Sequence, residues 1–150
     1  MFVFYNITTE YRYKCSEYTP EQLRQLCLQN TFGFFCLYKE YNGLICRYTV
    51  HEIRDENEFL LNMETLIIIT ELDSTLQNAT TITIPAEIDG VVVGRIYYNT
   101  FKNCTNLTTL NLQAKAGYKW EVNSIDCSTL TMQQIVKYAK EGHEFQQLPI

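Results

Sequence analysis

The sequence contains no apolar run long enough to cross a membrane. Its longest aliphatic run, residues 66–69, falls far short of the roughly 20 residues that a transmembrane helix needs. The N-terminus begins with apolar residues, but no basic segment precedes them and the chain becomes polar and acidic by Glu10, unlike a signal peptide. These absences predict a cytoplasmic protein, with an extracellular location as the less favoured alternative.

Positive charge is also scarce. The chain has 12 basic and 17 acidic residues, a formal net charge of −5, and its basic residues are scattered. Because binding to phosphates needs clustered Lys and Arg, direct nucleic-acid binding is not expected. Hydrophobic residues make up 46% of the chain and aromatic residues 13%, which excludes intrinsic disorder and predicts a compact body.

Recognisable catalytic and metal-binding motifs are missing. Neither of the two histidines, His51 and His143, lies in a known motif, and the chain has no nucleophile elbow, zinc-protease motif, phosphate-binding loop or dinucleotide fingerprint. The six cysteines include no C-x-x-C pair and no neighbouring His, which favours reduced, buried thiols over disulfides or zinc ligands. We therefore expect no catalytic residue, no metal site and no cofactor, and hence a non-enzymatic protein.

Residues 1–57 predict a small α+β unit. Residues 2–14 are rich in aromatic and β-branched types, which is typical of one long strand or two short ones. A helix is predicted to begin at Thr19, where Pro20 suits the first helical position and Gln22 completes a capping box.

A β-hairpin follows, with its turn at Asn42-Gly43. This dipeptide favours a type I′ turn because both residues readily adopt positive φ. The register then places four pairs on the better core face: Tyr41 with Leu44, Lys39 with Cys46, Leu37 with Tyr48, and Phe35 with Val50.

Residues 58–150 contain an internal repeat. The segment 78–84, Asn-Ala-Thr-Thr-Ile-Thr-Ile, reappears as Asn-Leu-Thr-Thr-Leu-Asn-Leu at 106–112, an offset of 28 residues. That offset lies within the period of roughly 20 to 29 residues found in leucine-rich repeats. Each copy ends in an alternating apolar triplet, as in a short strand with one buried face, so the two strands are expected to stack. Four residues would then form a flat polar face on the other side: Thr81, Thr83, Thr109 and Asn111.

A fixed order of residue types links the two copies. In sequence it is Ile84-Pro85, Ile88, Gly90, Val93, Ile96, Phe101, Cys104, Leu107, Leu110 and Leu112. This order resembles the repeat of the BspA-type leucine-rich-repeat family, with Thr100 where the family pattern has alanine. The resemblance covers residues 64–113, a third of the chain, and implies a stacked β structure. Within it, Asn99 is expected to cap a short helical turn.

The C-terminal residues are expected to cover one end of this stack. A solenoid needs about three repeats to bury its own faces, and fewer are visible here, so the flanking segments must cover both ends. Thr131 and Gln134 predict a capping box that starts a helix, and Gly142 predicts its end. The predicted fold class is α+β: an N-terminal strand-helix-hairpin unit (1–57) packed on a short leucine-rich-repeat-like β stack with a C-terminal capping helix (58–150), together one compact body.

The leading functional hypothesis is a protein–protein interaction module of leucine-rich-repeat type, whose partner is a protein. Tyrosine is enriched at interface hot spots, so exposed tyrosines are the candidate contact residues. The candidates are Tyr97, Tyr98, Tyr11, Tyr13 and Tyr38. The alternative is a small intracellular acidic inhibitor, encoded by a virus or mobile element, that binds and blocks a host defence enzyme or nuclease.

Overall fold

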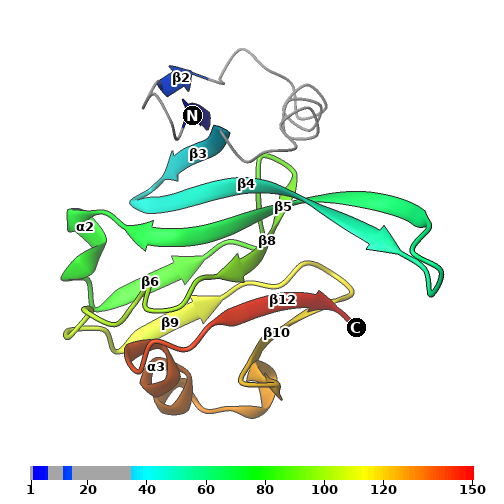
Figure 1. The fold of residues 1–150 in the computed structure, drawn as a ribbon. Helices are drawn as coiled ribbons and strands as arrows, with labels where there is room; N and C mark the ends of the chain where they lie inside the picture. The colour runs from blue at the N-terminus through cyan, green and yellow to red at the C-terminus, as the bar shows by residue number, and fades with distance from the viewer. Residues whose placement is uncertain (1, 7–11, 15–34) are drawn as a thin grey trace.

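The computed structural model describes residues 2–6, 12–14 and 35–150, which form a mixed α+β fold (Figure 1). The large sheet contains β1 (Phe2–Asn6), β2 (Arg12–Lys14), β3 (Phe35–Tyr41), β4 (Leu44–Arg54), β5 (Leu60–Leu72), β7 (Glu87–Ile88), β8 (Val91–Ile96), β10 (Tyr118–Val122), β11 (Ile125–Asp126) and β12 (Phe145–Pro149). The small sheet contains β6 (Thr81–Ile84) and β9 (Thr109–Leu112). The helical elements in these ranges are α2 (Ser74–Gln77), the 3₁₀ helix η1 (Cys127–Thr129) and α3 (Met132–Lys140).

The strands of the large sheet follow the order β11-β10-β12-β8-β5-β4-β3-β1-β2, with β7 paired to β8. At the N-terminal end, β1 pairs antiparallel with both β2 and β3, so the described residues between 2 and 14 form two short strands. The helix predicted to begin at Thr19 lies outside the described residues. Among those described, no helix combines the length and apolar character that a membrane crossing requires.

The hairpin of β3 and β4 has the predicted turn and register. Asn42 and Gly43 have φ values of 46° and 87°, and three of the four predicted residue pairs are present, all except that of Phe35 with Val50. Gly43 is also required by packing, because a Cβ atom there would lie 2.7 Å from Cγ of Leu76 in α2. Leu44 and Cys46 are buried, which confirms that the predicted face contributes to the core.

The predicted boundary between the two units lies within a single hairpin. Residues 55–59 connect β4 to β5, and these two strands pair antiparallel over most of their length. The Asp55 carboxylate accepts hydrogen bonds from the backbone N–H groups of Asn57 (2.8 Å) and Phe59 (3.0 Å). The large sheet is therefore continuous across the boundary.

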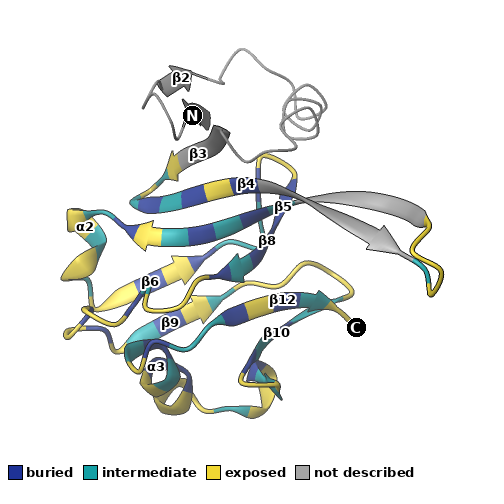
Figure 2. Ribbon diagram, viewed as in Figure 1, coloured by how far each residue is buried: buried dark blue, intermediate teal, exposed yellow. Residues whose placement is uncertain are grey.

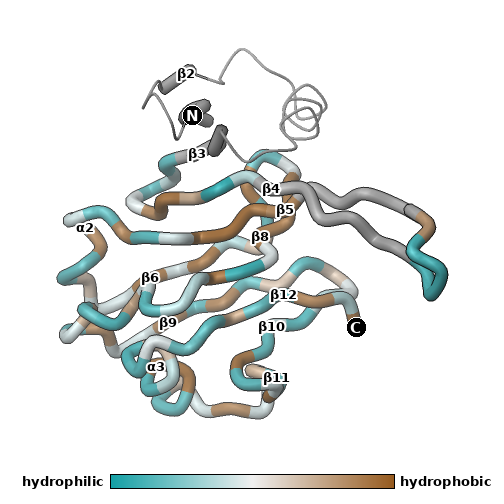
Figure 3. Tube along the Cα trace, in the orientation of Figure 1, coloured by the Kyte–Doolittle hydropathy of each residue, from teal (hydrophilic) through white to brown (hydrophobic). Residues whose placement is uncertain are grey.

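From β5 to β9 the chain alternates between the two sheets. In the large sheet β5 and β8 pair in parallel, and in the small sheet β6 and β9 pair in parallel with Thr81 opposite Thr109. The two copies of the internal repeat therefore stack in register, as predicted. Their inward side chains meet those of the large sheet in one core, whose members include Ile67, Ile69, Ile82, Ile84, Val93 and Leu110. Figure 2 shows the resulting alternation of buried and exposed residues along β6, and Figure 3 shows hydrophobic residues concentrated along β5.

Successive turns connect β8 to β9. Phe101, Cys104 and Leu107 are buried, and each of the last two donates its backbone N–H to the carbonyl three residues earlier. The inward face predicted for this segment is confirmed. The expected capping role of Asn99 is wrong, because its φ of 64° is left-handed whereas a helix N-cap is extended.

The C-terminal segment closes the open side of the repeat. Thr131 and Gln134 form both hydrogen bonds of the predicted capping box, and α3 packs against β9. The helix ends at Lys140, shortly before Gly142 with its φ of 85°, and β12 then pairs antiparallel with β8 and with β10. The helix was predicted, whereas the extension of the large sheet by β12 and β10 was not.

Candidate functional site

Two adjacent tyrosines directly follow β8 and are exposed to solvent. Tyr97 and Tyr98 retain 47% and 59% of their accessible surface, and their ring centroids lie 6.2 Å apart. The other exposed large hydrophobic residues in the described part of the chain are Phe59, Met132 and Ile150. Tyr97 and Tyr98 are therefore an exposed aromatic pair at the end of a core strand.

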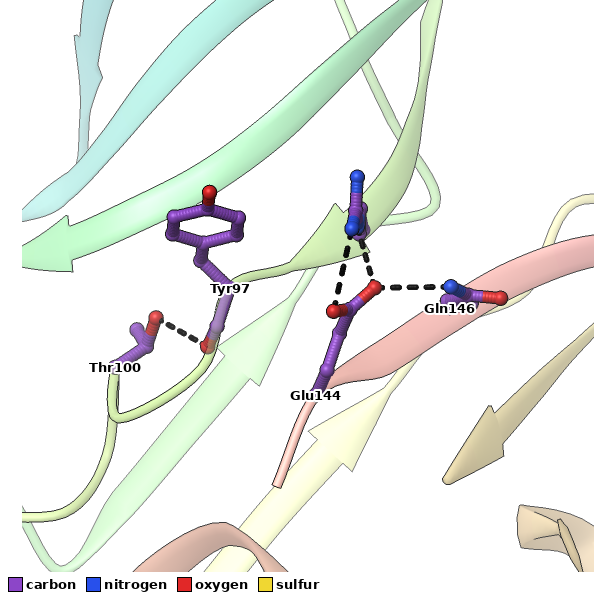
Figure 4. A network of polar contacts seen from close by, with 5 residues as sticks. Tyr97, Thr100, Glu144 and Gln146 are labelled. Carbon is purple, nitrogen blue, oxygen red and sulfur yellow. Dashed lines mark hydrogen bonds and ion pairs between the residues drawn. The ribbon is translucent and has the colours of Figure 1, made fainter. Parts of the chain in front are cut away.

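The backbone that carries this pair is fixed by hydrogen bonds. The Tyr97 N–H donates to the Ile69 carbonyl at 2.8 Å, and the Tyr97 carbonyl accepts from the Thr100 hydroxyl at 2.8 Å (Figure 4). Next to it, the Asn99 N–H donates to the Gly142 carbonyl at 3.0 Å. Gly142 packs so closely that a Cβ atom there would lie 2.3 Å from Oδ1 of Asn99. The tyrosine pair is thus held by β5 and by the segment that follows α3.

The guanidinium of Arg95 and the buried carboxylate of Glu144 lie next to the tyrosine pair. Arg95 forms an ion pair with Glu144 through Nε, and its Nη2 donates to Glu144 Oε2 at 3.3 Å. Gln146 donates to Glu144 Oε1 at 2.9 Å, and Figure 4 shows the Glu144 carboxylate at the centre of these bonds. The Arg95 guanidinium carbon lies 5.7 Å from the Tyr97 ring centroid, within the range of a cation–π contact.

The two charges stabilise each other. Burial opposes ionisation of Glu144, but hydrogen bonds from Arg95, Gln146 and Tyr98 outweigh it and hold the pKa of Glu144 below its usual value. The hydrogen bond to Glu144 raises the pKa of Arg95, against the opposing effect of burial. The pair is therefore fully charged at neutral pH.

A polar pocket of about 200 Å³ adjoins Tyr98. Its lining consists of Tyr98, Glu121, Asn123, Ser124, Glu144 and Gln146. Asn123 and Ser124 form the turn between β10 and β11 with φ values of 51° and 63°, and Glu121 lies 3.3 Å from the ammonium group of Lys119. We call the tyrosine pair, Arg95 and this pocket the tyrosine surface. It places two carboxylates beside exposed aromatic rings.

Two of the other predicted contact residues, Tyr13 and Tyr38, are not brought to this surface. Tyr11 lies outside the described residues, and Tyr13 and Tyr38 lie on β2 and β3. Because β4 and β5 separate β3 from β8, Tyr38 belongs to a different part of the large sheet. The predicted polar face is present on the small sheet, where Asn111 donates to the Thr83 hydroxyl at 3.3 Å.

The two charged groups beside the tyrosines, Arg95 and Glu144, could not be identified from the sequence. Arg95 and Glu144 are 49 residues apart and meet only because β8 and β12 are neighbours. No local pattern signals that contact. The one visible indication was Arg95, which lies two residues before Tyr97 in the sequence.

Thiols and metal ligands form no further site in the described ranges. Cys46, Cys104 and Cys127 are buried thiols, and burial raises the pKa of Cys127 to about 12. No group of three or more His, Cys, Asp or Glu side chains in these ranges is placed to hold a metal ion.

No family model, curated protein or solved structure compared with this chain matches it. The resemblance of residues 64–113 to BspA-type leucine-rich repeats stays a prediction.

Proposed function

We propose that this protein is a non-enzymatic protein-binding module and that the tyrosine surface contacts its partner. The observation that carries this proposal is the exposed Tyr97–Tyr98 pair on a backbone fixed by hydrogen bonds. An exposed ring of this size keeps apolar surface in contact with water, which costs free energy unless another surface covers the ring. Because the backbone that carries both rings is already fixed, less conformational entropy is lost when a partner docks.

The chemistry of the surface favours a partner with a basic side chain beside an apolar one. The carboxylates of Glu121 and Glu144 line the pocket next to Tyr98 in ion pairs with Lys119 and Arg95, so the attraction for a basic partner comes from the net charge of −5 of the whole chain. A Lys or Arg of the partner would be drawn by that charge and would lie against an exposed tyrosine ring. Association with such a partner should be slower at high salt, because screening weakens long-range attraction.

We also propose that residues 64–113 serve as the scaffold of this module in the manner of a BspA-type leucine-rich repeat. The parallel pairing of β6 and β9 at the repeat offset supports this proposal. So does the burial of Phe101, Cys104 and Leu107, which occupy positions of the family pattern. The repeat would set the position of β8, at whose end the tyrosines lie.

The experiment compares two double variants in binding to a partner recovered from a lysate of the source organism. Tyr97→Ala/Tyr98→Ala removes the aromatic pair, and Thr83→Ala/Thr109→Ala changes the exposed face of the small sheet as a matched control. Hot-spot residues typically contribute 2 kcal/mol or more, so the tyrosine variant should lose at least about 30-fold in affinity. The threonine variant should bind within about threefold of the wild type.

Two results would contradict or redirect the proposal. Equal affinity of the tyrosine variant and the wild type would move the interface elsewhere, with the N-terminal unit around Tyr11, Tyr13 and Tyr38 as the next candidate. If the partner is a nuclease or another enzyme and binding abolishes its activity, the inhibitor hypothesis replaces the plain module. Circular dichroism of each variant ensures that any loss of binding occurs in a folded protein.

A further inference from the structure

The hairpin of β4 and β5 projects beyond the strands that flank it in the large sheet (Figure 1). The strand β3 pairs with β4 only as far as Tyr48, and β8 pairs with β5 only from Leu66 onwards. Residues 50–54 and 60–65 therefore pair with each other and with no other strand in the described part of the chain. A strand segment of this length extends roughly 17 Å, at about 3.4 Å per residue. We call residues 50–65 the arm and residues 55–59 its tip.

The tip of the arm carries a phenylalanine whose side chain is in solvent. Phe59 is 67% exposed, and of the exposed large hydrophobic residues in the described ranges only Ile150 is more exposed. Figure 2 shows exposed residues along the tip, with no strand or helix beside them. A ring of this size in water costs free energy unless another surface covers it. Its place at the end of the arm leaves it accessible to another molecule.

Hydrogen bonds fix the backbone that carries this ring. The Asp55 N–H donates to the Phe59 carbonyl at 3.0 Å, and the Glu58 N–H donates to the Asp55 carbonyl at 3.1 Å. The Asp55 carboxylate accepts the N–H groups of Asn57 and Phe59. The backbone of Phe59 is thus bonded to Asp55 through both its N–H and its carbonyl. Because the tip is already ordered, less conformational entropy is lost when a partner covers the ring.

The tip is also acidic. Residues 55–59 include Asp55, Glu56 and Glu58 and no basic residue. Glu56 is exposed and forms no ion pair in the described ranges. These carboxylates would repel the phosphates of a nucleic acid or of an anionic membrane, whereas they would attract Lys and Arg side chains. The surface that complements the tip is therefore an apolar pocket with basic groups at its rim.

We propose that the tip inserts Phe59 into an apolar pocket of a protein partner and that Lys or Arg side chains at the rim of this pocket face Glu56. The exposed ring at the end of the arm and the negative charge around it carry this proposal. A two-stranded hairpin alone is only marginally stable in water, so a partner that encloses the arm would also stabilise it. The arm shares no residue with the tyrosine surface, so either contact can form without the other.

A cyclodextrin with amino groups on its rim is a chemical model of such a pocket and serves as the probe. Its cavity encloses a phenyl ring, and its protonated amino groups supply the positive rim. The full chain is titrated with this probe and with neutral cyclodextrin, and the ring resonances of Phe59 are followed by nuclear magnetic resonance. We expect a saturable shift with the amino probe and at least about twofold weaker binding of the neutral one.

Matched variants separate the ring from the charge. Phe59→Ala should bind the amino probe at least about tenfold more weakly than the wild type. Tyr97→Ala/Tyr98→Ala removes the other exposed rings and should bind it within about twofold of the wild type. Glu56→Gln should weaken binding about twofold to fivefold, whereas Glu141→Gln, the same change in charge at an exposed residue outside the arm, should not. Equal binding of the two cyclodextrins, or an unchanged affinity of Phe59→Ala, would overturn the proposal.

Photocrosslinking from the tip then determines what kind of surface it contacts. A benzophenone amino acid replaces Phe59 in the full chain, or the exposed Gln133 as a control, and each variant is irradiated in a lysate of the source organism. Mass spectrometry of the product from position 59 should map it to an apolar pocket bordered by Lys or Arg in one identified protein. Adding Glu56→Lys should reduce this product at least about fivefold. A product with nucleic acid, lipid or a second copy of this chain, or no product beyond that of the control, would overturn the proposal.

Discussion

Replacing Gln147 with leucine should destabilise the protein, because this buried amide joins three segments of the fold. Gln147 is only 4% exposed. Its Oε1 accepts from the Lys115 N–H at 2.8 Å, and its Nε2 donates to the carbonyls of Val93 (2.8 Å) and Ala86 (3.2 Å). Leucine has a similar size but can make none of these bonds.

The expected loss follows from the partners that leucine would leave behind. The Ala86 carbonyl keeps the N–H of Val93 at 2.9 Å, and the exposed Lys115 can turn to water. The buried Val93 carbonyl loses this bond, at about 1 to 3 kcal/mol, and the Lys115 bond contributes about 1 kcal/mol more. We therefore expect Gln147→Leu to lower the free energy of unfolding by roughly 2 to 4 kcal/mol.

Urea denaturation followed by circular dichroism measures this loss. Gln133→Leu is the matched control, because Gln133 is exposed on α3 and the same chemical change there should alter stability by less than about 0.5 kcal/mol. Equal midpoints and slopes for Gln147→Leu and the control would refute the role given to this amide. They would also contradict the placement of β12 beside β8.

Three further outcomes follow from the same packing. Phe101→Ala and Leu110→Ala should each lower the free energy of unfolding by about 2 to 5 kcal/mol, since both side chains are almost fully buried, and melting temperatures near the wild-type value would contradict the repeat core. Cys127 should react with a thiol reagent at pH 8 far more slowly in the native protein than in urea, because burial raises its pKa to about 12. Burial alone would raise the pKa of Glu144, but its hydrogen bonds, chiefly from Arg95, lower that pKa below the ordinary value of 4.5. The ion pair of Arg95 with Glu144 therefore stabilises the fold above that pH, and this stabilisation is lost as the pH falls through the pKa of Glu144 in the native protein. Acid unfolding of Arg95→Met should therefore depend less steeply on pH below about 5 than that of the wild type.

Elements with a strong local signal could be predicted from the sequence. Asn42-Gly43 determines its own turn because few other dipeptides accept positive φ at both positions. The capping box at Thr131 satisfies backbone groups within four residues of sequence, so its pattern is visible without the fold. The 28-residue repeat predicted the pairing of β6 with β9 for a similar reason, since equivalent residues occupy equivalent positions.

Long-range pairing could not be read in the same way. The strand β12 has the sequence Phe-Gln-Gln-Leu-Pro, in which the inward residue Gln147 is polar and hides the alternation that marks a strand. The ion pair of Arg95 with Glu144 depends on β12 lying beside β8, so it was hidden as well. Exposure of Tyr97 and Tyr98 was predicted from residue type, whereas the contacts that fix them required the structure.

Site-specific photocrosslinking tests most directly whether the tyrosine surface contacts a protein partner. A benzophenone amino acid replaces Tyr98 in one variant and Thr83 in another, and each is irradiated in a lysate of the source organism. Both positions are exposed, so the probe is equally accessible in the free protein. We expect a discrete crosslinked product from position 98 that competes away with the unlabelled wild type, and none from position 83. A product from position 83 and none from position 98 would contradict this expectation.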